Sequence, residues 1–409
     1  MKALESEIAI IGGGPVGLAA ACCLADAGLQ VLLIDAGKEV LTIDELAANS
    51  SESAFDPRVS ALTVSSQGML SAVGAWEDIA SVRLCPYDQM AVWDGEGTGA
   101  IQFSAAELHT PALGHIVENR VLTAALNRQV ESRQSITVMR DTHVESIEKH
   151  EQGSITLLLS GNVSIEAGLV IGADGAHSFV RQQADFTVRE WDYGHEAIVT
   201  TVKTAAPHGY TAWQRFMESG PLAFLPLHVP GLERSDQCYC SIVWSCVTER
   251  AEGIKALDDD QFKAALGAAF ESRLGEVLET DRRFSFPLWQ RHATDYVQDN
   301  LALIGDAAHT IHPLAGQGVN MGFADVQALS EVISGALKKG EDIHTRQVLS
   351  RYQRHRKGQN LGMMAAMEGF KRLFASEDLS IKWLRNTGMN LTNKTPLVKQ
   401  QLMRLAMGL

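Results

Sequence analysis

The sequence lacks a hydrophobic run of the ~18 residues needed to cross a membrane, and it lacks a cysteine pattern typical of a zinc site or a disulfide framework. Its six cysteines include no CxxC pair, which predicts reduced residues in the core and in strands. The N-terminus passes from a short polar start into an apolar stretch, without the longer apolar segment and cleavage site of a signal peptide. We therefore expect a cytoplasmic protein that is, at most, peripheral at the inner face of the membrane.

Positive charge is also scarce: 35 Lys and Arg stand against 49 Asp and Glu, a net charge of −14 that argues against nucleic acid as a partner. The charge is unevenly placed. Residues 351–409 hold eleven Lys or Arg and three Asp or Glu, a net charge of +8, which leaves −22 on residues 1–350. Length and composition, with 409 residues and 45% hydrophobic side chains, predict a globular enzyme of about two domains.

A glycine-rich turn lies near the N-terminus, between an apolar strand and a small-residue helix. Gly12, Gly14 and Gly17 have the GxGxxG spacing. Gly12 permits the tight turn, Gly14 lets the backbone approach a pyrophosphate, and Gly17 allows close helix packing. A second strand then ends in Asp35, where a carboxylate can bind the ribose hydroxyls of an adenosine. The pattern predicts a βαβ unit that binds a dinucleotide.

Two further segments offer polar groups at expected strand ends or in loops. Asp174 and Gly175 follow an apolar strand; Asp174 could cap the next helix or face a nucleotide. Arg58, in the loop FDPRVSALT, could be a mobile ion-pair partner or a contact of a phosphate or flavin.

The stretch from residue 305 to residue 322 reads GDAAHTIHPLAGQGVNMG and lies between an apolar strand and an amphipathic helix expected over residues 319–337. Asp306, at the strand's end, can accept hydrogen bonds from sugar-like hydroxyls. Backbone amides near Gly316, Gln317 and Gly318 would lie at the positive end of that helix, where they could stabilise an anion. An ordinary strand-to-helix connection is the alternative.

Taken together, these three motifs in order resemble those of the single-component flavoprotein aromatic hydroxylases, the group that includes p-hydroxybenzoate hydroxylase. Within that group the chain is similar to the ubiquinone-biosynthesis hydroxylases through FDPRVSALT, GHIVENRVL, GDAAHTIHPLAGQGVNMG and the terminal AMGL. The segments DPRVSALT, WDYGH and GPLAFLP most resemble the bacterial branch that hydroxylates 2-polyprenylphenol, conventionally at C5. Branches that act on methoxylated intermediates share most of these motifs.

The resemblance implies FAD as cofactor, NAD(P)H as transient electron donor, and hydroxylation of a polyprenylated phenol with dioxygen through a flavin hydroperoxide. Asp35 stands where many members have Glu, which shortens its reach. The implied FAD contacts are Gly12, Gly14, Gly17, Asp35, Arg58, Asn119, Arg120, Asp174, Gly175, Gly305, Asp306, Val319 and Asn320. The residues expected to position the flavin and stabilise its negative charge are His312, Pro313, Gly316, Gln317 and Gly318.

The implied fold is α/β: a Rossmann-like FAD-binding domain with an inserted antiparallel β-sheet substrate domain and a helical C-terminal tail. The FAD-binding domain is expected over residues 1–75, 106–185 and 285–340, the substrate domain over 76–105 and 186–284, and the helical region over 341–409. That region should be interrupted near Gly388 and Pro396. Residues 41–55, polar and rich in small side chains, are expected to form a loop.

For the substrate, candidate pocket walls are the apolar residues Phe216, Leu222, Phe224 and Leu225; the alternative is that they are simply core. No metal site is expected, because no carboxylate or thiol pattern completes one around the histidines of the late motif. The basic tail carries apolar residues at helical spacing and could contact a membrane, a ubiquinone-biosynthesis protein complex or the acidic body of the chain itself.

Three rival functions resemble the expected one. A flavin-dependent halogenase would have a similar fold, but its WxWxIP motif is absent. A flavin-dependent prenyl reductase would also need an apolar cavity, but it would reduce its substrate and would not consume dioxygen. A non-catalytic assembly subunit could retain FAD.

Overall fold

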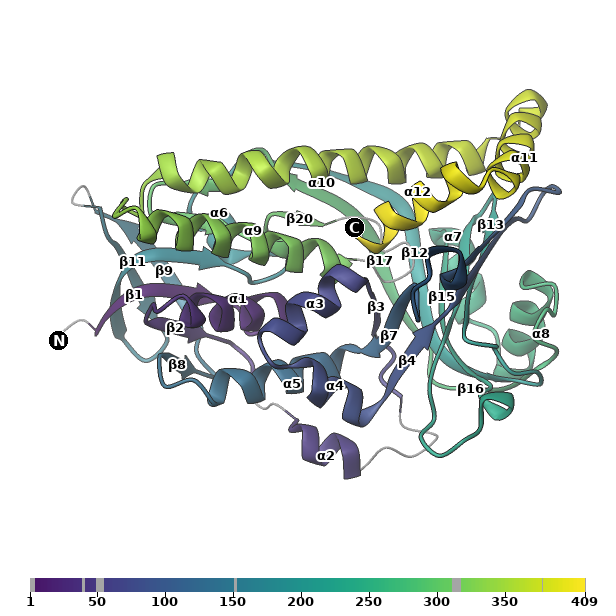
Figure 1. The fold of residues 1–409 in the computed structure, drawn as a ribbon, viewed down its shortest axis with the longest axis horizontal. Helices are drawn as coiled ribbons and strands as arrows, with labels where there is room; N and C mark the ends of the chain where they lie inside the picture. The colour runs from purple at the N-terminus through teal and green to yellow at the C-terminus, as the bar shows by residue number, and fades with distance from the viewer. Residues whose placement is uncertain are drawn as a thin grey trace.

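The computed structural model describes residues 4–38, 41–48, 55–150, 153–310, 318–376 and 378–408. Two large sheets and one small sheet are joined by helices, and α10 (Arg346–Ala375) runs along the length of the molecule above both large sheets (Figure 1). This mixed architecture confirms the predicted α/β class with an antiparallel second sheet and a helical C-terminal region. No described helix is long and apolar enough to cross a membrane.

The first sheet is built on parallel pairing of β1 with β2 and with β11, extended by β8 on one side and β19 on the other. Helices α1 and α9 pack against each other and on this sheet, which requires apolar residues on its central strands. All four residues of β2 are buried for that reason. Its strands are β1 (Leu4–Ile11), β2 (Val31–Ile34), β8 (Ile136–Met139), β9 (Val144–Lys149), β10 (Ile155–Leu159), β11 (Val163–Gly172), β18 (Val297–Gln298) and β19 (Leu301–Leu303).

The second sheet is antiparallel except where β13 pairs with β5 in parallel. A separate three-stranded antiparallel sheet has the order β3-β7-β4, with β7 at its centre. The strands of the second sheet are β5 (Gln89–Asp94), β6 (Ala100–Ser104), β12 (Val188–Thr204), β13 (Thr211–Met217), β14 (Gly220–Pro226), β15 (Tyr239–Val247), β16 (Val277–Thr280), β17 (Phe284–Ala293) and β20 (His309–Thr310); those of the small sheet are β3 (Val59–Leu62), β4 (Leu84–Tyr87) and β7 (Gly114–Glu118).

The helices cover the sheets and build the C-terminal region. Besides α10, they are α1 (Pro15–Asp26), α2 (Ile43–Ala48), α3 (Val64–Ala72), α4 (Trp76–Val82), α5 (Asn119–Glu131), α6 (Phe179–Gln183), α7 (Thr248–Lys255), α8 (Asp259–Ala269), α9 (Gly318–Lys338), α11 (Leu379–Lys394) and α12 (Pro396–Met407), with short 3-10 turns η1 (Ala105–Leu108), η2 (Arg234–Asp236) and η3 (Gly305–Ala307). The expected helix over residues 319–337 is thereby confirmed as α9.

Several boundary predictions are wrong. The expected loop over residues 41–55 contains α2, in which Ile43 and Leu46 are buried. The helix α4 was assigned to the substrate domain, but its Ile79 belongs to the core of the first sheet. The strand β17, assigned to the FAD-binding domain, pairs with β12 of the second sheet.

The C-terminal break is also displaced from its predicted position. The chain leaves α10 at Ser376, and Asp378 then caps α11, since its Oδ1 accepts hydrogen bonds from the amides of Ser380 (2.8 Å) and Ile381 (3.2 Å). Gly388 lies inside α11, because the low helix propensity of one glycine is too weak to end a helix that tertiary contacts stabilise. Pro396 does begin the next helix, α12, as its first residue.

All six cysteines are free, and four of them are buried. Burial raises the pKa of Cys22 to about 12 and that of Cys246 to about 11, so these thiols stay protonated at neutral pH. The prediction of reduced cysteines in the core and in strands is confirmed for these residues.

A buried histidine in the connection between β12 and β13 makes the fold sensitive to acid. The ring of His208 accepts a hydrogen bond at Nδ1 from the amide of Tyr210 (3.0 Å), and its Nε2 lies 3.0 Å from the carbonyl oxygen of Leu227. This arrangement requires the neutral ring, and burial lowers the pKa of His208 to about 4. Because the unfolded value is about 6.5, the stability that the neutral ring contributes is complete above that pH and is lost as the pH falls toward 4.

We expect the free energy of unfolding of a His208→Gln variant to depend less steeply on pH between about 6.5 and 4 than that of the unaltered protein. Denaturant unfolding at a series of pH values, with the same FAD content in both proteins, measures the two slopes. Equal slopes would contradict the view that the buried, neutral ring of His208 contributes to the pH dependence of stability.

Candidate active site

The turn between β1 and α1 has the geometry that its three glycines predict. Gly12 has a φ of +114°, and a Cβ placed there would overlap the carbonyl oxygen of Ala173. A Cβ at Gly17 would overlap the carbonyl oxygen of Gly12, so this glycine lets α1 pack against the turn. A Cβ at Gly14 would meet nothing within 4 Å. Gly12 and Gly17 are therefore required by protein packing, whereas Gly14 borders open space at the N-terminus of α1.

The acidic residue after β2 lies beside this turn. A Cβ at Gly13 would come within 2.5 Å of Asp35 Oδ2, so the carboxylate rests against the glycine backbone. The structure thus brings Asp35 to the edge of the same open space that Gly14 borders.

The DG motif (Asp174 and Gly175) and the GD motif (Gly305 and Asp306) meet the glycine turn, although the three segments are far apart in the sequence. Arg181 is almost fully buried and donates from Nη1 to the carbonyl oxygen of Ala307 (2.8 Å) and from Nη2 to that of Ala176 (2.8 Å). Ala173, just before Asp174, contacts Gly12 as described above. The three motifs therefore form one site, which none of them could indicate alone.

Helix α9 closes on this site through Val16 of α1. A Cβ at Gly322 would come within 2.5 Å of Val16 Cγ2, and a Cβ at Gly305 within 3.1 Å of Val16 Cγ1. Gly305 also has a φ of +59°. Close approach of α1, α9 and the η3 turn thus depends on glycine at both positions.

Asp174 helps to cap α6 and keeps one carboxylate oxygen unpaired. Its Oδ2 accepts hydrogen bonds from the amides of Phe179 (2.7 Å) and Val180 (3.1 Å), which is the predicted helix cap. Its Oδ1 is buried and has no hydrogen-bond partner in the described part of the chain. Buried polar atoms are rarely left unpaired, so this oxygen fits a donor from a bound group. The neighbouring Gly175 has a φ of +81° and open space around it.

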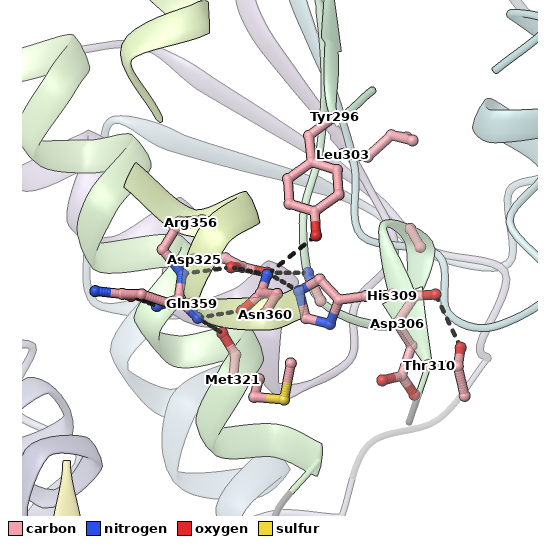
Figure 2. A network of polar contacts seen from close by, with 12 residues as sticks. Tyr296, Leu303, Asp306, His309, Thr310, Met321, Asp325, Arg356, Gln359 and Asn360 are labelled. Atoms are coloured by element: carbon pink, nitrogen blue, oxygen red, sulfur yellow. Dashed lines mark hydrogen bonds and ion pairs between the residues drawn. The ribbon is translucent and has the colours of Figure 1, made fainter. Parts of the chain in front are cut away.

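The carboxylate of Asp306, in the η3 turn, is open to solvent on one side and points away from the buried polar contacts behind it (Figure 2). Desolvation by the protein atoms on its other sides raises the pKa of Asp306, and the nearby charges of His309 and Arg58 oppose that shift. An accessible but partly desolvated carboxylate is well placed to accept hydrogen bonds from a ligand.

The predicted contacts around β3 and β7 form a second group beside Arg58. The carbonyl oxygen of Arg58 accepts a hydrogen bond from the amide of Asn119 (2.9 Å), whose Oδ1 in turn accepts one from Ser60 Oγ (2.7 Å). Arg120 forms an ion pair with the buried Glu118 (2.8 Å). These side chains are engaged with the protein, so their contribution to a cofactor site stays a prediction.

Residues at the start of α9 divide into two groups. His312, Pro313, Gly316 and Gln317 lie outside the described residues. Gly318 begins α9 and Val319 packs on the core. The side chain of Asn320 accepts hydrogen bonds from Thr63 N (3.1 Å) and Ser66 Oγ (2.7 Å) and donates to the carbonyl oxygen of Ala61 (2.7 Å). Since this side chain links α9 to β3 and α3, only its backbone amide is available to a cofactor.

The four predicted pocket residues do not lie on one face of the second sheet. Side chains of β14 alternate, so Leu222 and Phe224 belong to the core beneath α7 and α8, where Phe224 stacks on Phe270 at 3.7 Å. Leu225 lies on the opposite face. Phe216 contacts α10, with its ring 4.2 Å from that of Phe374. The prediction is therefore wrong for Leu222 and Phe224, which are core residues.

Phe216 does line a small, partly open cavity, of about 40 Å³, between the second sheet and the C-terminal part of α10. Most of its other walls are apolar or aromatic, and a cation is placed among them. The amino group of Lys371 donates to the carbonyl oxygen of Tyr193 (3.2 Å) and lies 4.3 Å from the centre of that ring.

Sequence reasoning missed a buried polar network behind the GD motif (Figure 2). Asp325 of α9 is fully buried; its Oδ1 accepts from Arg356 Nε (2.8 Å), and its Oδ2 accepts from the amide of Gly305 (3.0 Å) and contacts His309 Nε2 (2.5 Å). Burial acts to raise the pKa of Asp325, but His309 and Arg356 outweigh it and lower that pKa below its usual value. Asn360 extends the network by donating to the hydroxyl of Tyr296 (3.3 Å).

One sequence signal could have identified the network: Asp325 occupies a position on the inward, otherwise apolar face of α9. A carboxylate there requires buried partners. Arg356 and Asn360 are four residues apart on α10, so their side chains lie on the same side of that helix. By its bond to Gly305, the network orients the turn that carries Asp306.

Comparison with known proteins identifies the family. The model of the FAD binding domain family matches residues 5–364, which is most of the chain. The chain belongs to this family. It is a FAD-dependent monooxygenase, and the residues around Gly14, Asp35, Asp306 and the unpaired oxygen of Asp174 fit the cofactor.

Relatives of this flavoprotein span its whole length. It is 38% identical to "3-demethoxyubiquinol 3-hydroxylase" of Escherichia coli over 404 residues, covering 99% of both chains. It is 36% identical to "Ubiquinone biosynthesis monooxygenase COQ6, mitochondrial" of Xenopus tropicalis, covering 98% of this chain and 93% of that protein. The resemblance to ubiquinone-biosynthesis hydroxylases is confirmed; its assignment to the 2-polyprenylphenol branch is not.

Solved structures share the fold of this flavoprotein. The p-nitrophenol 4-monooxygenase PnpA from Pseudomonas putida has a TM-score of 0.75 at 19% identity, with 98% of this chain and 97% of that chain covered. PqsL from Pseudomonas aeruginosa, described as a probable FAD-dependent monooxygenase, has a TM-score of 0.73 at 18% identity, covering 95% and 100% of the two chains. Among the described residues, no group of three or more His, Cys, Asp or Glu could hold a metal ion.

The different surroundings of the glycines give a matched pair of variants. We expect Gly14→Ala to leave the stability of the apoprotein within about 0.5 kcal/mol but to weaken FAD binding, because the added methyl group stands where the diphosphate approaches. Gly17→Ala should destabilise the apoprotein itself, because its methyl group overlaps the Gly12 carbonyl. Unfolding of the apoproteins and titration with FAD separate the effects; equal FAD affinity in Gly14→Ala and the unaltered protein would contradict this role.

Proposed function

We propose that this flavoprotein hydroxylates the ring of a polyprenylated phenol or quinol in ubiquinone biosynthesis, with NAD(P)H as electron donor and dioxygen as oxidant. Its similarity over the whole chain to hydroxylases of that pathway carries the proposal. The 38% identity to a 3-demethoxyubiquinol 3-hydroxylase favours a demethoxyubiquinol as substrate over 2-polyprenylphenol, the ring expected from the sequence motifs.

The protein's part in this reaction is to bind and orient the cofactor. FAD supplies the redox chemistry and the activation of dioxygen. The open N-terminus of α1 at Gly14 would receive the diphosphate, and Asp35 the adenosine ribose. Asp306 would accept hydrogen bonds from the ribityl hydroxyls, and Asp174 Oδ1 would accept one further donor from the cofactor.

Negative charge on the reduced flavin ring would be stabilised from the start of α9. The first amides of this 21-residue helix, from Gly318 onward, have no partner within the helix and carry its positive dipole end. Preorganised donors of this kind stabilise developing charge without having to reorient. The predicted contributions of His312, Pro313, Gly316 and Gln317 remain part of this proposal.

The substrate ring would be enclosed between the cofactor and the second sheet, where an apolar environment excludes the water that would otherwise release peroxide. Phe216 is the predicted pocket residue that lies beside a cavity, and the rings of Phe374 and Tyr193 share it. Leu225 lies on the face of the sheet away from α7 and α8, buried in a separate apolar cluster, and its predicted contact with the substrate remains part of this proposal.

A comparison of two substrates tests the function. Purified protein is incubated with NADH or NADPH, isotopically labelled dioxygen, and a demethoxyubiquinol or a 2-polyprenylphenol with the same short isoprenoid chain. We expect substrate-stimulated oxygen uptake and a product carrying one labelled oxygen atom, with faster turnover of the demethoxyubiquinol. A reduced prenyl chain without oxygen uptake would indicate a reductase, and absence of FAD binding would overturn the proposal.

A further inference from the structure

Helix α11 faces the protein with a row of asparagines, whereas α12 buries Met403 and Met407 in an apolar cluster with Leu113. On α11, Asn386 Oδ1 accepts a hydrogen bond from the amide of Gly99, Asn390 Oδ1 from that of Ala100 (3.3 Å) and Asn393 Oδ1 from that of Gln102 (3.2 Å). These asparagines thereby cover backbone groups along β6, the edge strand of the second sheet.

The outward side of the same helices is apolar. Large apolar side chains, which are usually buried in a hydrophobic core, are open to solvent here. The most exposed are Leu379 (82%), Leu397 (81%) and Trp383 (68%). Of the large hydrophobic side chains that are exposed in the described chain, most lie after residue 360. We call the nine that lie on α11 and α12 the outer face: Leu379, Ile381, Trp383, Leu384, Leu391, Leu397, Val398, Leu402 and Leu405.

The outer face belongs to a firmly attached element. Arg385 is buried, forms an ion pair with Asp94 of β5 (2.6 Å) and donates to the carbonyl oxygens of Leu373 (3.0 Å) and Phe374 (3.1 Å) at the end of α10. Lys399 of α12 is paired with Glu107 (2.7 Å). The polar groups that could have covered the outer face are used in attachment, so its exposure is a consequence of how the helices are docked.

Charge indicates what covers the outer face. Residues 379–408 contain five Lys or Arg and no Asp or Glu, whereas residues 1–350 carry −22. Arg385 and Lys399 are paired with carboxylates of the protein, which leaves Lys382, Lys394 and Arg404 for an external partner. Lys394 and Arg404 are exposed beside the apolar residues. Leucine, tryptophan and lysine side by side on a helix surface are suited to the boundary between lipid headgroups and acyl chains, and the cations favour anionic lipid.

The outer face also lies next to the cavity at the end of α10. Phe374 and Lys371 line that cavity, and α11 begins only four residues after Phe374's helix ends (Figure 1). Phe370, 48% exposed, lies on the same segment with its ring 6.4 Å from that of Phe216. An apolar cavity beside an apolar surface suits a substrate whose isoprenoid chain resides in a bilayer.

We propose that the outer face of α11 and α12 binds the surface of an anionic lipid bilayer and that the cavity beside Phe216 and Phe374 admits the isoprenoid chain of the substrate from it. The second part rests on the proposed function. The first part does not, because lipid binding can be measured without substrate or turnover.

Co-sedimentation with vesicles tests the first part. The full-length protein with FAD should bind vesicles of phosphatidylcholine and phosphatidylglycerol and bind vesicles of phosphatidylcholine alone much more weakly. The double variant Trp383→Ser, Leu397→Ser should lose about 30-fold in partition to the anionic vesicles, since each side chain contributes apolar area to the contact. Added salt should weaken binding of the unaltered protein.

The matched control is Trp191→Ser, Leu278→Ser, which removes two exposed apolar side chains from the second sheet. It should bind vesicles like the unaltered protein, and both double variants should turn over a water-soluble substrate analogue at the unaltered rate. Equal vesicle binding by the two double variants would overturn the proposal. So would a self-association of the unaltered protein, measured by light scattering, that Trp383→Ser, Leu397→Ser abolishes without any loss of vesicle binding, because the outer face would then be an interface between copies.

A failure of the proposed function would look different. Labelled oxygen would then be missing from the product, whereas vesicle binding and its loss in Trp383→Ser, Leu397→Ser would persist. If the hydroxylation is confirmed, the cavity is tested by Phe374→Trp: filling it should raise the KM for a long-chain substrate more than for one without an isoprenoid chain. Equal changes in both KM values would contradict the second part.

Discussion

Replacing Asp325 with alanine is expected to lower the free energy of unfolding of the apoprotein by about 3–5 kcal/mol, because a buried Arg356 would be left without its carboxylate. The same substitution removes the acceptor of the Gly305 amide and the partner of His309. Because that amide belongs to the turn that carries Asp306, FAD affinity should fall as well. Denaturant unfolding of the apoprotein and titration with FAD measure the two effects separately.

A double-mutant cycle is the control for Asp325. Asp325→Leu combined with Arg356→Met removes both charges and should destabilise the protein less than the sum of the two single substitutions. Asp325→Asn keeps the shape of the side chain and should fall between the unaltered protein and Asp325→Ala. Additive losses in the cycle would contradict the view that the buried pair acts as a unit.

Replacing Asp306 with alanine is expected to weaken FAD binding about 10- to 100-fold, the effect of losing hydrogen bonds to a charged acceptor. In contrast to Asp325, the Asp306 carboxylate is open to solvent and points away from the buried network (Figure 2), so stability of the apoprotein should change little. The flavin content after gel filtration and the dissociation constant of FAD from titration of the apoprotein give the measurement.

Asp306→Asn is the matched control, because it keeps one acceptor oxygen without the charge and should lose less affinity than Asp306→Ala. A flavin content in Asp306→Ala equal to that of the unaltered protein would show that this carboxylate does not bind the cofactor. A loss of apoprotein stability as large as that of Asp325→Ala would show instead that it is structural.

Local sequence was sufficient to predict those features in which the role of a residue depends on its neighbours in the chain. The spacing of Gly12, Gly14 and Gly17 predicts a turn, and the structure shows two of these glycines required by packing and the third facing open space. The helix after the GD motif and the α/β class were also predictable, because periodicity and the order of elements determine both. Motif order along the chain likewise indicated the family that the comparisons show.

Pairing and packing between distant segments decided the rest. Leu222 and Phe224 are apolar like Leu225, and the sequence does not distinguish the three. The alternation of side chains along β14 places Leu222 and Phe224 on the face covered by α8 and Leu225 on the other face. Asp325 becomes the centre of a network only when α10 brings Arg356 beside it.

The C-terminal helices show the same division. Their amphipathic pattern and positive charge can be recognised in the sequence, and that pattern predicts helices with one apolar side. Which side faces the protein depends on the unpaired backbone of β6 and the carboxylate of Asp94, which the asparagines and Arg385 of α11 satisfy. Periodicity defines the faces of a helix, whereas the partners that the fold supplies decide which face is buried.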